Sequence, residues 1–145
     1  MKRGFVVTVV TALVLVCSSQ YLLAQRRPWY RGNVRETIRQ LETDTDRFKS
    51  SLDRALDNSP LNGTRTEDEI NGYVKNFEAA TDRLRDRAED QDYAPGLARE
   101  VLNRGRAINV FMRTHRLGGA AESDWAIVRN DLNRLANGYN IRWRW

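Results

Sequence analysis

Two glutamates and two threonines recur at the same spacing in separate parts of the chain, and their side chains are candidates for binding or catalysis. Glu42 precedes Thr45 by three positions, and Glu78 precedes Thr81 by three. Carboxylates beside hydroxyl groups can hold a metal ion or a polar substrate. Both threonines fall on apolar helical stripes, where an aliphatic residue would pack better. The repeat therefore predicts a polar layer that faces the interior of the fold.

The turn segment 60–63 lies midway between the two repeats. If the helices on either side fold back as an antiparallel hairpin, residues that face each other have position numbers with a constant sum. The glutamate of each repeat is then expected beside the threonine of the other. Arg104, on the apolar face of a later helix, is expected at the same level and would supply the countercharge.

Two interpretations of this mid-bundle layer are open. It is either a pocket for a polar ligand or a metal, or a buried polar layer that fixes the register of the helices, which we favour. Cys17 lies in the N-terminal segment and His115 is the only histidine, so the domain lacks the residues for a Cys/His or Ser/His/Asp arrangement. We therefore expect no catalytic residue, no metal and no cofactor.

Aromatic and basic residues gather near both ends of the domain. In a bundle with an even number of helices these two ends lie together. They are expected to form either an aromatic lid on the bundle or a binding face for a lipid headgroup, a glycan or a partner protein. The candidate residues are Trp29, Tyr30, Tyr139, Trp143, Trp145, Arg142 and Arg144.

The elements that position these residues are helices. Apolar residues recur at alternating spacings of three and four, which is typical of an amphipathic helix packed in a bundle. The expected helices are 34–56, 67–89, 95–116 and 121–137. Since the connections are short, we predict an all-α, antiparallel four-helix bundle.

After Gly138 the period changes, because aromatic or aliphatic residues alternate with polar ones up to Trp145. This is typical of an extended segment, and we expect the tail to pack on the end of the bundle near Trp29. The predicted organisation is a signal peptide at 1–25, a linker at 26–33, the four-helix bundle at 34–138 and the tail at 139–145.

The first 25 residues resemble a secretory signal. Lys2 and Arg3 precede an uncharged run from Phe5 to Val16, and the small residue Ala24 follows. We expect cleavage after position 24 or 25 and export to the periplasm or beyond. A retained N-terminal membrane anchor is the alternative.

Several stretches of the domain resemble an uncharacterised group of exported bacterial helical proteins. The resemblance implies a helical fold and export, and it implies no activity. The stretches that carry it are 45–48, 61–71, 80–87, 100–104 and 139–143.

The charge of the chain argues against a nucleic-acid partner. The whole chain has 24 basic and 19 acidic residues, and removal of Lys2 and Arg3 leaves 22 basic residues and a net charge of +3. This mild, mixed charge, together with export, favours a non-catalytic envelope protein that binds or scaffolds through its surface, as a monomer. The alternatives are a periplasmic chaperone-like helical protein, and an enzyme or metal site at the mid-bundle layer.

Overall fold

The computed structural model describes residues 27–90 and 92–145, with side chains from residue 33 on. The predicted signal peptide therefore lies outside the described residues. So do the side chains of Trp29 and Tyr30.

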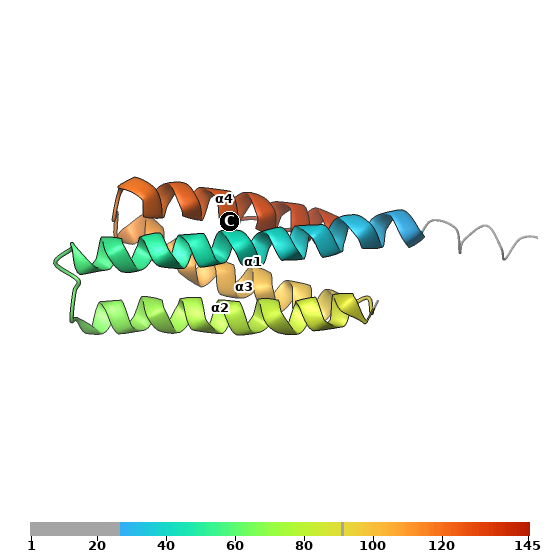
Figure 1. Cartoon of the computed structure of the whole chain (residues 1–145), viewed down its shortest axis with the longest axis horizontal. Coiled ribbons are helices and arrows are strands. Elements are labelled where there is room, and N and C mark those ends of the chain that lie inside the picture. Colours follow the sequence, from blue (N-terminus) through green and yellow to red (C-terminus); the bar gives the residue numbers. More distant parts are fainter. Residues whose placement is uncertain (1–26, 91) are drawn as a thin grey trace, which may run out of the picture.

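The chain folds into four helices: α1 (Arg27–Asp57), α2 (Arg65–Glu89), α3 (Pro95–Thr114) and α4 (Gly119–Gly138). They run up and down alternately, with α1 packed mainly against α4 and α2 mainly against α3 (Figure 1). The structure confirms the prediction of an all-α, antiparallel four-helix bundle.

The beginning of α1 differs from the prediction. The helix starts at Arg27, so residues 27–33, which were expected to form a linker, are helical. Pro28 does not prevent this, because proline is tolerated in the first turn of a helix, where its missing N–H group has no partner in any case. The other helices begin and end within two residues of the predicted positions.

One continuous apolar core runs through the bundle, built from the stripes that the spacing predicts. Burial of these side chains holds the helices together, since most of the stability of a helix in a protein comes from packing its apolar face. The largest fully buried side chains are Phe48, Phe77, Ile38, Leu41, Leu52, Leu56, Ile70, Leu84, Leu102, Ile108, Leu132 and Leu135.

The C-terminal tail turns back along the bundle instead of closing its end. Asn140 has a φ of +53°, a left-handed conformation that reverses the chain after α4. Trp145 Nε1 then donates to Asn133 Oδ1 at 3.0 Å, and Arg106 Nη2 of α3 donates to the carbonyl of Arg144 at 2.8 Å. The C-terminus accordingly lies level with the middle of α4 (Figure 1).

The alternating pattern of the tail is reflected in its burial: Tyr139 is buried, Ile141 and Trp143 are half-buried, and the intervening polar residues are exposed. The expected position of the tail, across the bundle end, is wrong for its last residues. The tryptophans contact side chains of α3 and α4, which hold these residues alongside the two helices.

Candidate functional site

Four of the five residues of the predicted mid-bundle layer lie together in a groove between α1 and α2. Glu42, Thr45, Glu78 and Thr81 all line this groove, which has a volume of about 580 Å³. Both threonines are buried, but each hydroxyl donates to the carbonyl four residues earlier in its own helix, at 2.6 and 3.0 Å. The threonines therefore do not depend on the glutamates for a hydrogen-bond partner.

Both glutamates of the groove have a cationic partner. Arg85 Nη1 lies 2.6 Å from Glu42 Oε1, and Lys49 Nζ lies 3.1 Å from Glu78 Oε1. Burial raises the pKa of Glu42, and the charge of Arg85 opposes that increase. In the described part of the chain, no three His, Cys, Asp or Glu side chains are grouped so that they could hold a metal ion. In this groove, each of the two glutamates is paired with a cation from the neighbouring helix.

Arg104 does not belong to this layer, contrary to the prediction. Its side chain is 49% exposed and lies 3.6 Å from Glu100. The neighbouring Gly105 takes the inward position, where a Cβ atom would lie 2.6 Å from Leu132 Cδ1. Because the core has no room for a side chain there, α3 turns its glycine inward and the arginine outward.

A second pair of carboxyl groups lies between α1 and α4, where the sequence analysis expected none. Asp44 is 3% exposed and Asp131 is 1% exposed, and both side chains line one groove between the two helices. A carboxyl group can donate to a second carboxylate only while it holds a proton. Arg47 lies 3.1 Å from Asp44, and Arg134 lies 3.2 Å from Asp131.

Burial, followed by the nearby carboxyl group of Asp44, raises the pKa of Asp131 to about 6. Arg134 opposes this shift. The arrangement follows the general behaviour of two carboxyl groups that share one site, in which one of them retains a proton well above its ordinary pKa.

The sequence did contain a signal for this pair. Asp44 follows Leu41 by three positions and Asp131 follows Val128 by three, so each aspartate falls at a stripe position. A charged residue at such a position marks a buried polar contact as clearly as the threonines did.

The predicted aromatic and basic end residues separate into two groups. Tyr139 stays at the end of the bundle, where its ring stacks on Tyr93 at 5.4 Å and burial raises its pKa to about 12. Trp143 and Trp145 contact each other edge to face, beside α3 and α4. The exposed residues of the tail are Asn140, Arg142, Arg144 and Trp145.

An arginine lies over each of the two tail tryptophans. Arg106 of α3 is 4.4 Å from the centre of the Trp143 ring, and Arg129 of α4 is 5.8 Å from the centre of the Trp145 ring. Cation–π contacts of this kind hold the guanidinium groups at the surface while they fix the rings beneath them.

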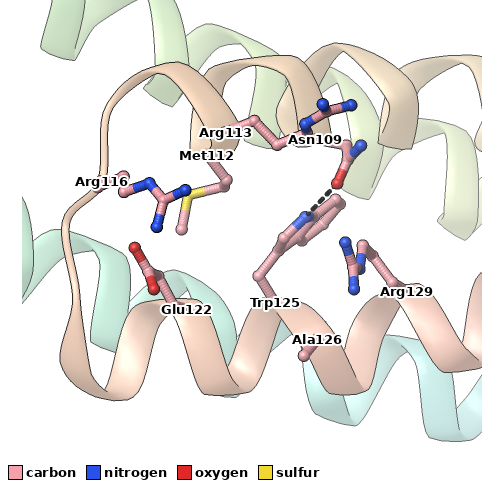
Figure 2. Close-up of a pocket in the computed structure, with 8 residues that line it drawn as sticks. All are labelled: Asn109, Met112, Arg113, Arg116, Glu122, Trp125, Ala126 and Arg129. Carbon is pink, nitrogen blue, oxygen red and sulfur yellow. Dashed lines mark hydrogen bonds between the residues drawn. The ribbon is translucent and has the colours of Figure 1, made fainter.

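Next to Arg129, α3 and α4 enclose a pocket of about 350 Å³ (Figure 2). Trp125 forms its wall and donates from Nε1 to Asn109 Oδ1 at 3.1 Å. Arg116 and Glu122 lie at one end, and Arg129 lies beside Trp125 at the other. The full lining is Asn109, Met112, Arg113, Arg116, Glu122, Trp125, Ala126 and Arg129. This pocket could not be predicted from the sequence, because its three arginines come from α3, from the connection between α3 and α4, and from α4, and share no motif.

Comparisons with protein-family models, with curated proteins and with solved structures find no match for this chain. The resemblance to exported helical proteins stays a prediction. Among the helices of residues 27–145, none is both long enough and apolar enough to cross a bilayer.

The α3–α4 pocket offers cations and hydrogen-bond donors with a single carboxylate. Such a set of side chains is suited to holding an anion, because arginine can donate two parallel hydrogen bonds to a phosphate or carboxylate group. We name the arginine–tryptophan surface for its members Arg106, Arg113, Arg116, Arg129, Trp143 and Trp145.

Proposed function

We propose that this chain is an exported, non-catalytic protein of the cell envelope that binds an anionic membrane surface. The arginine–tryptophan surface is the contact region. The observation that carries the proposal is the continuity of this surface: Arg106 covers Trp143, Trp143 contacts Trp145, and Arg129 connects Trp145 to the arginine-lined pocket.

The charges of this region differ from those of α2. There, Arg83, Arg85 and Arg87 each lie within 4 Å of a carboxylate. None of the four arginines of the arginine–tryptophan surface forms an ion pair with a carboxylate of the described residues. Their charges are therefore available to an external anion.

Apolar groups accompany these charges. Val110 is 59% exposed and lies between Arg106 and Arg113 on the outer face of α3, at spacings of four and three. Trp145 is 36% exposed. Tryptophan, arginine and scattered aliphatic residues are the combination that settles at the level of lipid headgroups.

A lipid surface explains the arrangement better than a glycan does. Sugars bind tryptophan by lying on the face of the ring, and here an arginine covers one face of Trp143 and of Trp145. Each arginine near an anionic bilayer contributes about 1 kcal/mol, so four give on the order of 4 kcal/mol. This predicts weak, reversible binding that salt weakens.

Co-sedimentation with vesicles tests the proposal. Protein lacking residues 1–25 is expected to bind vesicles that contain phosphatidylglycerol and to leave pure phosphatidylcholine vesicles unbound. Binding should fall as the salt concentration is raised from 0.1 to 0.5 M, because the Debye length shortens from about 10 Å to less than half of that.

The double variant Arg106→Gln/Arg113→Gln is expected to lose most of this binding. The matched control, Arg65→Gln/Arg87→Gln, removes the same charge from exposed positions of α2 and should bind like the parent protein. An equal loss of vesicle binding in both variants would show that binding depends on net charge alone, which would overturn the proposed surface. Absence of binding by the parent protein would overturn the membrane proposal itself.

A further inference from the structure

We propose that the α3–α4 pocket binds the phosphate group of a ligand that carries a hydrogen-bond donor close to that phosphate. The inference rests on the proposed function, because it assigns one headgroup chemistry to the pocket within the arginine–tryptophan surface. It goes further in predicting a stoichiometric site, which a diffuse electrostatic attraction does not require.

The size of the pocket fits a small anionic group. Its volume of about 350 Å³ is near the lower limit of typical ligand sites. Arg116 and Arg129 approach it from opposite ends, and Arg113 adds a third cation at the rim (Figure 2). A phosphate between the first two would accept hydrogen bonds from both guanidinium groups, which phosphate geometry favours.

One donor of the pocket has no acceptor inside the protein. Nε of Arg129 is buried, and no hydrogen-bond partner for it exists among the described residues. A buried donor without a partner is costly, and an anion bound in the pocket would supply the acceptor. The neighbouring indole does not compete for that anion, because Trp125 Nε1 already donates to Asn109.

Glu122 determines what else the ligand must carry. One of its carboxylate oxygens accepts a hydrogen bond from the backbone N–H of Gly118 at 3.2 Å. A bare anion would be repelled by this carboxylate. A phosphate with a neighbouring ammonium or hydroxyl group would instead donate to Glu122 while its phosphate oxygens meet the arginines.

The test uses a matched pair of soluble ligands. Phosphoethanolamine has an ammonium group with N–H donors, whereas phosphocholine has the same charge and no N–H donor. Binding is followed through the indole N–H resonance of Trp125 in NMR spectra of protein lacking residues 1–25. Phosphoethanolamine is expected to shift this resonance with saturation at one site, and to bind about tenfold more tightly than phosphocholine, since hydrogen bonds to charged groups contribute about 1.5–3 kcal/mol.

Three variants test whether phosphoethanolamine binds in this pocket. Arg116 is exposed, so its replacement should not disturb the packing of the core. Arg116→Gln should weaken phosphoethanolamine binding at least about tenfold. Arg65→Gln is the matched control, because Arg65 is exposed at the start of α2 and does not line the pocket, so the affinity of this variant for phosphoethanolamine should be unchanged. Glu122→Gln should remove the preference for phosphoethanolamine over phosphocholine.

Vesicles distinguish a lipid headgroup from a soluble phosphate ester. If the natural ligand is a lipid, phosphatidylethanolamine added to phosphatidylglycerol vesicles increases binding of the parent protein and not of Arg116→Gln. If only the soluble compound binds, the pocket serves a free phosphate ester, and the phosphate assignment still holds. No saturable shift with phosphoethanolamine, or an unchanged affinity in Arg116→Gln, would overturn the inference. In that event, vesicle binding that still depends on Arg106 and Arg113 would leave the proposed function standing.

Discussion

At the scale of single residues, the contact between Asp44 and Asp131 is the most consequential feature of the bundle. Two carboxyl groups are removed from water between α1 and α4, and burial together with the nearby Asp44 raises the pKa of Asp131. Because the folded pKa of Asp131 is raised, the folded state binds this proton more tightly than the unfolded chain does. The contribution to stability is therefore fully present below the ordinary pKa of 3.8 and is lost as the pH rises to about 6.

This predicts a pH dependence that Asp131→Asn removes. An asparagine can donate a hydrogen bond to Asp44 at any pH. Relative to this variant, the wild-type protein should lose on the order of 3 kcal/mol of unfolding free energy between pH 4 and pH 6.5. Urea unfolding of both proteins across this range measures the difference. A difference that does not change with pH would show that Asp131 binds no proton in the fold.

The neighbouring positions 104 and 105 provide a second test at this scale. Arg104→Met should change the unfolding free energy by only about 0–1 kcal/mol, because the arginine is half exposed and its ion pair with Glu100 lies at the surface. Gly105→Val should destabilise the protein by about 1–3 kcal/mol, since it forces atoms against Leu132 in a filled core. Thermal unfolding of the two variants compares them directly. A large loss of unfolding free energy in Arg104→Met would show that Arg104 is part of the buried polar layer after all.

At the scale of elements, the tail acts as a fifth packing segment. It lies along α3 and α4, and Trp145 contacts the ring of Trp125 at 6.4 Å between centroids. The terminal position of the tail would ordinarily favour disorder. Here the partial burial of Ile141 and Trp143 and two hydrogen bonds to α3 and α4 offset the entropy of ordering five residues.

Removal of residues 141–145 should therefore lower the melting temperature, by about 4 °C or more for each kcal/mol lost. It should also increase the exposure of Trp125, which is 3% exposed in the intact fold. Calorimetry and acrylamide quenching of tryptophan fluorescence measure the two effects. Arg142→Gln is the control, because Arg142 is exposed and should not alter either quantity. If the truncated protein melts at the same temperature as the intact one, the tail does not contribute to the stability of the bundle.

At the scale of the whole molecule, we expect a monomer. Among the side chains that the structure describes, the large apolar ones that remain exposed lie on different elements: Tyr73 on α2, Val110 on α3, Ile127 on α4, and Tyr93 and Trp145 on the connecting and terminal segments. A stable dimer generally requires one contiguous apolar patch of larger area. Sedimentation at increasing protein concentration should give the mass of one chain throughout. A mass that rises with concentration would indicate a self-associating face.

The local pattern of the sequence was sufficient to predict the four helices. Helical periodicity is a property of residues a few positions apart, so it can be read without knowing which helices are neighbours. The turn at 60–63 is short, and this constrains the register of the hairpin closely enough to bring Glu42, Thr45, Glu78 and Thr81 together.

The contacts between distant segments were decided only by the tertiary structure. Successive residues of a helix point about 100° apart, so the rotation of α3 about its axis determines whether Arg104 or Gly105 faces inward, and the position of Leu132 favours the glycine there. The path of the tail depends on Arg106 and Asn133, which lie in two different helices. The Asp44–Asp131 pair and the arginine-lined pocket likewise bring together side chains from different segments of the chain. A local hydrophobic pattern does not specify which segments become neighbours. Local propensity therefore determined the elements of this protein, whereas packing between them determined its sites.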